Sequence, residues 1–324
     1  MVTLCAPPTG LVRPVPVDPA GLRGPTRGQA GGPRWRRSSW GLYVPSHVDA
    51  SVPEQRILEQ SMRLPGGAVT GWASLRMHGA AFFDGLRDSG RSQAPVPLSS
   101  TAFHQVRPDA GDDVIRDMLY DWEIELVHGV PCTTPDRATF DAVRFAPSLR
   151  AAVVAMDMAM AAGLTTMERM VDYVGRKQTW TGVQRARDAL AHADENSWSP
   201  PETRLRLMWV LDAGRARPLT NRPLFDLGGT LLGYPDLLDP VAGVVGEYDG
   251  ADHRDAATHS SDVDRESGLR RHFLEVFRVT GPDMGHPDRV VRRIHTAYDL
   301  ARHVPPAQRT WTLTPPPWWR RSAA

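Results

Sequence analysis

Four side chains that can bind a cation or move a proton lie close together in the chain: Asp236, Glu247, Asp249 and His253. The apolar run Val241–Val245 precedes the last three, and such a run predicts a buried strand that ends in acids. Carboxylates on neighbouring antiparallel strands come within about 5 Å of one another. They repel unless a hard dication neutralises them, and Mg²⁺ held by carboxylates suits phosphodiester hydrolysis.

Alternation along a strand places Glu247 and Asp249 on one face, and Asp236 joins them if the strand before it pairs in register. His253 is then a candidate general base or proton shuttle, because histidine titrates near neutral pH. The alternative is that these acids at a strand end are solvated turn residues. Asp236 follows a proline and can begin a turn, and His253 alone is more often a surface residue.

Two further observations separate these interpretations. Ser199 and Glu202 have the spacing of a helix capping box, which needs no catalysis. Glu247 is harder to explain structurally, because a carboxylate beside an apolar strand is costly to bury without a partner.

The elements that must position these residues follow from the pattern after Ser199. The segment 199–214 predicts a capped helix, and 222–250 predicts three strands with turns at 227–229 and 239–240. A polar helix at about 258–273, a strand at 274–280 and a last helix at 287–304 complete the order α-β-β-β-α-β-α. We therefore expect a domain over residues 196–304, with a disordered tail at 305–324.

Five segments of this domain carry a likeness to a known superfamily. They are "SPPETRLR", "GYPDLLDP", "VVGEYDGADHRD", "SDVDRESGL" and "EVFRVT". With Pro235-Asp236 and Glu247-x-Asp249 at their centre, residues 197–302 resemble the PD-(D/E)XK nucleases, in particular the branch similar to very-short-patch-repair endonucleases. The resemblance implies a restriction-endonuclease-like αβββαβ core, and so an α+β or α/β fold.

By this resemblance Glu202, Asp236 and Glu247 would bind Mg²⁺ or Mn²⁺, and His253 would assist the attacking water. Asp249 stands where most of the superfamily has a lysine, and the only lysine of the chain lies outside the domain. The related repair branch also lacks that lysine.

Two arginines of the domain complete the expected site. Arg265 and Arg278 would contact DNA phosphates or pair with the acids.

The first 195 residues predict a different region. Residues 1–33 are rich in Pro and Gly and predict a flexible lead-in, and 34–195 predict an α+β and helical region. "RRSSWGLYVP", "VTGWASLRMHGAAFFDG" and "PCTTPDRATFDAV" resemble AbiEi-type antitoxins of type IV toxin–antitoxin systems. The resemblance implies the wing of a winged helix, although the preceding residues hold too much Gly and Pro for a recognition helix.

Basic and aromatic residues alternate in this wing. Arg34, Arg36 and Arg37 would grip phosphates beside Trp35 and Trp40. The alternative is a solvated arginine face on a strand whose tryptophans belong to the core.

Length, net charge, cysteine spacing and apolar runs limit the possible classes of protein. The chain has 324 residues and a formal net charge of +1. A charge this small gives no overall electrostatic attraction to nucleic acid or to a membrane. Cys5 and Cys132 lack metal-site spacing, and the longest apolar run, 151–164, is too short for a bilayer. We expect a cytoplasmic protein without a membrane partner.

Two hypotheses remain open from the sequence. The first is a Mg²⁺-dependent DNA endonuclease with an N-terminal region that docks DNA or a cognate toxin-like protein. The alternative is a non-catalytic DNA-binding or antitoxin-type regulator built on a degenerate nuclease fold.

Overall fold

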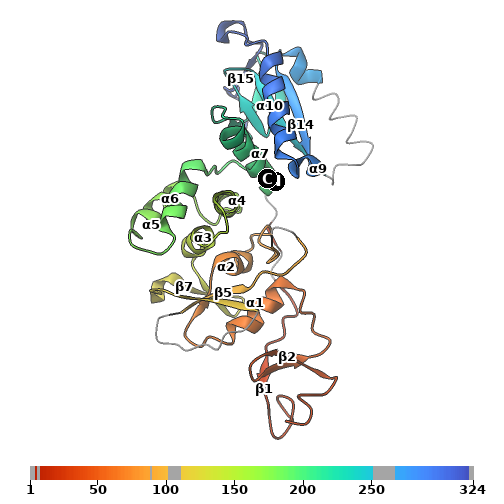
Figure 1. Ribbon diagram of the computed structural model, residues 1–324, viewed down its shortest axis with the longest axis vertical. Helices are drawn as coiled ribbons and strands as arrows, with labels where there is room; N and C mark the ends of the chain where they lie inside the picture. The colour runs from red at the N-terminus through yellow and green to blue at the C-terminus, as the bar shows by residue number, and fades with distance from the viewer. Residues whose placement is uncertain (1–3, 6–7, 88–89, 101–110, 251–266, 321–324) are drawn as a thin grey trace. The chain divides into compact units, whose positions relative to one another are not determined.

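The structure is a computed structural model that describes residues 4–5, 8–87, 90–100, 111–250 and 267–320. It mixes helices and sheets, as the α+β prediction requires (Figure 1). The chain divides into an N-terminal unit ending at Ala191 and a C-terminal unit beginning at His192, a few residues before the expected boundary at 195/196. Among the described residues no helix is long and apolar enough to cross a bilayer.

The N-terminal unit is built on a five-stranded sheet of order β6-β5-β4-β8-β7. Its strands are β4 (Ala68–Val69), β5 (Val96–Ser100), β6 (Asp112–Arg116), β7 (Ile124–Val127) and β8 (Val130–Thr133). Helices α1 (Pro53–Ser61) and α2 (Gly71–Met77) pack on this sheet through Ile57, Leu58 and Ala73. The helices that follow are α3 (Pro135–Arg144), α4 (Leu149–Ala161), α5 (Met167–Gly175) and α6 (Val183–His192).

A buried polar network ties these helices to the sheet. Arg137 is fully buried and donates to Glu123 and Asp141. The Nζ atom of Lys177 lies 3.0 Å from Glu123 Oε1 and 4.2 Å from the Trp180 ring centre. Burial lowers the pKa of Lys177 even though Glu123 opposes the shift. The only lysine of the chain is therefore a core residue of the N-terminal unit.

The predicted wing is present as a hairpin of β2 (Trp35–Ser39) and β3 (Leu42–Pro45). A third strand, β1 (Val15–Pro16), pairs with β3, so the lead-in expected to be flexible contributes to a sheet. No helix occurs among the described residues before α1, which leaves the wing without a recognition helix there.

The C-terminal unit contains a mixed sheet of order β14-β13-β12-β9. The strands are β9 (Leu219–Thr220), β12 (Leu237–Asp239), β13 (Val244–Asp249) and β14 (Glu275–Thr280). Neighbouring strands are antiparallel except β13 and β14, which are parallel. Parallel strands end at the same edge of a sheet, so the acids that end β13 lie beside the end of β14.

Helices cover one face of this sheet. They are α7 (Pro200–Leu207), continued by the π-helical turn η2 (Met208–Asp212), and α10 (Pro287–Leu300), which follows the short α9 (Gly281–Met284) (Figure 1). Their apolar side chains, Trp209 and Ile294 among them, pack on Leu237, Val244 and Val279.

The opposite face is covered by a second, smaller sheet and differs from the expectation. Three strands were expected between 222 and 250, but β10 (Leu224–Asp226) and β11 (Leu231–Gly233) leave the main sheet and pair with β15 (Trp311–Thr312). Trp311 is buried there. The tail expected to be disordered therefore forms part of a core, because its tryptophan reaches the apolar back of the main sheet.

Candidate active site

Asp236, Glu247 and Arg278 come from three neighbouring segments: Asp236 directly precedes β12, Glu247 lies on β13 and Arg278 lies on β14. Leu237, the first residue of β12, pairs with Gly246, and extending this register by one position would place Asp236 beside Glu247. Glu247 is in turn the register partner of Arg278. Partners in register point to the same face of a sheet. We call Asp236, Glu247 and Arg278 the polar row.

The polar row marks the point where one sheet face changes from apolar to polar. The preceding row on the same face is Leu238, Val245 and Val276, all buried in the core beneath the smaller sheet. The members of the polar row are half-buried. A carboxylate held at the rim of an apolar core keeps access to solvent while its surroundings strengthen its interactions with cations.

Asp236 is fixed by the backbone of the neighbouring strand. Tyr248 N, on β13, donates to Asp236 Oδ2 over 2.7 Å. The bond to an ionised acceptor is strong and orients the carboxylate. It also gives Asp236 a structural role, because the bond ties the residue before β12 to β13.

Asp249 lies one step further along the same face and is paired with Arg278. The distance from Arg278 Nη1 to Asp249 Oδ2 is 3.4 Å, with side-chain exposures of 30% and 39%. Solvent screens a pair of this exposure, so it contributes little stability. A guanidinium from β14 thus reaches the acid that ends β13.

Glu202 does not join the polar row, contrary to the expectation that it binds metal. Its Oε2 accepts from Trp198 N at 2.9 Å and from Asn221 Nδ2 at 2.8 Å, while Oε1 accepts from Ser199 Oγ at 2.8 Å. Ser199 Oγ accepts in return from Glu202 N. The Ser199 side chain therefore caps α7, and the bonds from Trp198, Ser199 and Asn221 engage both carboxylate oxygens of Glu202.

The described residues contain no group of three or more His, Cys, Asp or Glu side chains arranged around one metal position. A cation held by three protein carboxylates therefore does not fit this part of the chain. Asp236 and Glu247 as a pair do suit Mg²⁺, which keeps several waters and is usually bound by one or two carboxylates together with substrate phosphates. His253 and Arg265 lie outside the described residues.

Asn221 was not anticipated from the sequence. It occupies the left-handed region with φ 49°, and its Nδ2 also donates to Asn196 O at 2.8 Å. Its backbone N donates to Pro235 O at 3.1 Å, directly before Asp236. Asn221 therefore connects the capped start of α7 to the strand that carries Asp236. An asparagine between two short strands was the only available signal, since asparagine tolerates positive φ.

The candidate arginines of the hairpin divide into two kinds. Arg36 makes a bidentate ion pair with Glu59, at 2.7 and 3.0 Å, and that bond raises the pKa of Arg36. Arg36 is a structural link to α1, which corrects its assignment to DNA. Arg34 is exposed, and the Arg37 guanidinium lies 5.0 Å from the ring centre of Trp40, which is 64% exposed. The expectation that this tryptophan is core is wrong.

Comparison with known proteins adds no family. No family model, no curated protein and no solved structure matches the chain. The functional argument therefore depends on the site alone.

Proposed function

We propose that the C-terminal unit is a divalent-cation-dependent DNA endonuclease with a restriction-endonuclease-like core. In support of the proposal, α7 is followed by the antiparallel strands β9, β12 and β13 and by β14, which is parallel to β13, although β9 lies before the segment 222–250 in which the three strands were expected. The observation that carries the proposal is the polar row, because its register gathers two acids and one cation at the rim of the sheet.

Each member of the row has a distinct part in the proposed reaction. Asp236 and Glu247 hold Mg²⁺ or Mn²⁺, and the Tyr248 amide fixes the orientation of the Asp236 carboxylate. The cation, when bound, neutralises phosphate charge and lowers the pKa of a bound water. Arg278 contributes a permanent positive charge on the same face that can contact a phosphate oxygen. From the sequence, His253 is the candidate that accepts the proton of the attacking water.

A second candidate function is a non-catalytic DNA-binding or antitoxin-type regulator. Two observations favour it: Glu202 is engaged by hydrogen bonds at the start of α7, and Arg278 already pairs with Asp249. In this alternative the polar row stabilises the fold, and the exposed Arg34, Arg37 and Trp40 of the hairpin dock DNA or a toxin-like protein.

Plasmid cleavage tests the proposal. The full chain should nick or linearise supercoiled DNA in Mg²⁺ or Mn²⁺, and Asp236→Asn and Glu247→Gln should each lower the rate by about 100-fold, the loss typical of removing one electrostatic group from an active site. Asparagine retains an acceptor for the Tyr248 amide, so Asp236→Asn should remain folded.

Glu275→Gln is the matched control, because Glu275 is an acid on β14 that pairs with Arg270 outside the polar row. Cleavage that persists in EDTA, or that is unaffected in both polar-row variants, would refute the nuclease proposal. Tight DNA binding without any turnover would favour the regulator.

A further inference from the structure

Helix α10 begins at the same end of the main sheet as the polar row. β14 ends at Thr280, α9 follows directly, and α10 starts at Pro287. The acids of β13 lie at this end because β13 and β14 are parallel. The helix covers the face of the sheet opposite to the polar row.

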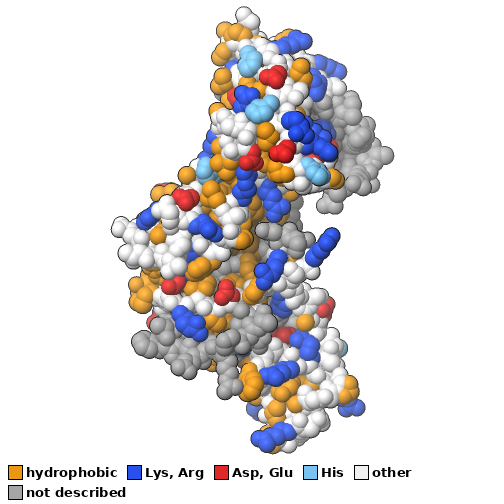
Figure 2. Space-filling view, viewed as in Figure 1, with side chains coloured by type: hydrophobic (Ala, Val, Ile, Leu, Met, Phe, Trp, Pro, Cys, Tyr) orange, Lys and Arg blue, Asp and Glu red, His pale blue; other side chains and the backbone are white. Residues whose placement is uncertain are grey.

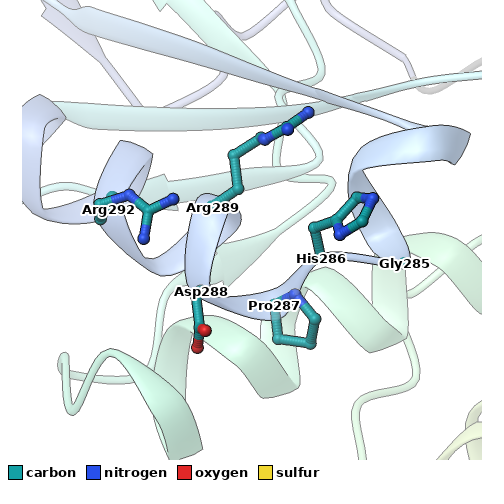
Figure 3. Close-up of a pocket in the computed structure, with 6 residues that line it drawn as sticks. All are labelled: Gly285, His286, Pro287, Asp288, Arg289 and Arg292. Atoms are coloured by element: carbon teal, nitrogen blue, oxygen red, sulfur yellow. The ribbon is translucent and has the colours of Figure 1, made fainter.

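The exposed side of α10 is basic. Val290, Ile294 and Ala297 are buried against the sheet, which turns Arg289 and Arg292 outward. Figure 3 shows both arginines and His286 as they line one hollow of about 380 Å³ at the start of the helix. In Figure 2 basic side chains gather over the region of α10 and β14.

A second hollow, of about 420 Å³, continues along the helix. It lies between α10 and β14, the edge strand of the sheet, and it shares Arg289 and Arg292 with the first. Arg293, Thr296 and Phe277 also line it. The two hollows form one track, which we call the α10 groove.

Asp283 and Glu275, two of the acids near the groove, are engaged by arginines, whereas Asp288, which also lines the first hollow, and Arg292 form no ion pair among the described residues. Asp283 accepts from Arg293 at 2.6 and 3.0 Å, and Arg289 lies 3.5 Å from it. Glu275 is paired with Arg270. Arg292 makes no ion pair or side-chain hydrogen bond with any residue that the structure describes. Its charge is therefore available to a ligand.

We propose that the α10 groove binds the backbone phosphates of duplex DNA beside the polar row. This inference rests on the proposed function, because it identifies the surface that would hold the substrate. Arg289 and Arg292 are about 4.5 Å apart along the helix axis, close to the 3.4 Å advance per phosphate of one DNA strand. A single strand can thus present a phosphate to each arginine, and the groove reads no base.

The test is the salt dependence of DNA binding by the full chain, measured by fluorescence anisotropy with a labelled duplex in EDTA. Each lost phosphate contact lowers the slope of log K against log salt by about 1. Arg292→Ala should therefore reduce the slope by about 1, and the Arg289→Ala/Arg292→Ala double variant by about 2. Arg204→Ala, at an exposed arginine of α7, should leave the slope unchanged.

Wild-type slopes in both groove variants would overturn the inference. So would Arg292-dependent binding of inorganic phosphate with an unchanged DNA slope, because the groove would then be an isolated anion site. No cleavage is needed for this measurement, so the two proposals can fail separately. If the variants reduce the slope but the chain cuts no plasmid, the groove proposal stands and the nuclease proposal fails. If the chain cuts plasmid normally but the variants leave the slope unaltered, the nuclease proposal stands and the groove proposal fails.

Discussion

At the residue scale, the same chemical group serves different ends at Glu202 and Asp236. Both are half-buried carboxylates in the C-terminal unit. Glu202 accepts three hydrogen bonds with both of its oxygens, from Trp198, Ser199 and Asn221, whereas Asp236 accepts from Tyr248 N on the neighbouring strand β13. Its bonds at the start of α7 make Glu202 part of the helix cap. The position of Asp236 beside β13 makes it a candidate metal ligand.

Glu202→Gln tests this division. The glutamine amide cannot accept all three bonds, so the free energy of unfolding should fall by about 1 kcal/mol, as for other lost helix caps. Plasmid cleavage by the folded fraction should remain within about twofold of wild type. Chemical denaturation measures the first quantity. Unchanged stability with abolished cleavage would identify Glu202 as a ligand after all.

At the element scale, the junction of α9 and α10 holds the groove and the end of β14 together. Asp283 accepts from Thr280 N and Thr280 Oγ1 at the start of α9, and its two bonds from Arg293 join that turn to α10. The bonds from Arg293 first, and then those from Thr280, hold the pKa of Asp283 well below its usual range. One carboxylate thus links two helices and a strand end.

This shift makes the stability of the junction depend on pH. A depressed folded-state pKa gives stability that is complete above the unfolded-state value of about 3.9 and is lost as the pH falls below it. Asp283→Asn should destabilise the C-terminal unit by about 2 kcal/mol at pH 7, and the difference from wild type should shrink below about pH 4. Urea unfolding from pH 7 to pH 3 measures this. A constant difference over that range would exclude the ionised Asp283 as the cause.

Much of the main sheet could be predicted from the sequence, for identifiable reasons. The alternation of Val245, Glu247 and Asp249 fixes their common face, and the length of the turn after β12 fixes the register with Asp236. The choice of Glu202 between cap and ligand could not be predicted, because the same Ser-x-x-Glu spacing serves both. The ion pair of Arg36 with Glu59 could not be predicted either, because Glu59 lies on a different element, α1.

At the scale of the whole molecule, the chain consists of two units with separate polar centres. The N-terminal unit places its only lysine in a buried network with Glu123, where every charge has a partner within the core. The C-terminal unit places its acids at the rim of a sheet. A buried, balanced network specifies a fold, whereas half-exposed acids in a row are suited to a ligand. The tail and the lead-in were expected to be loose, but Trp311 and β1 tie parts of them to these units.

The central claim is that Asp236 and Glu247 together hold a divalent cation. Electron paramagnetic resonance of Mn²⁺ titrated into the full chain tests it most directly, because no turnover is required. We predict one bound Mn²⁺ that is displaced by Mg²⁺, is lost in both Asp236→Asn and Glu247→Gln, and persists in Glu202→Gln. Absence of bound Mn²⁺ in the wild type, or binding that survives both polar-row substitutions, would contradict the account.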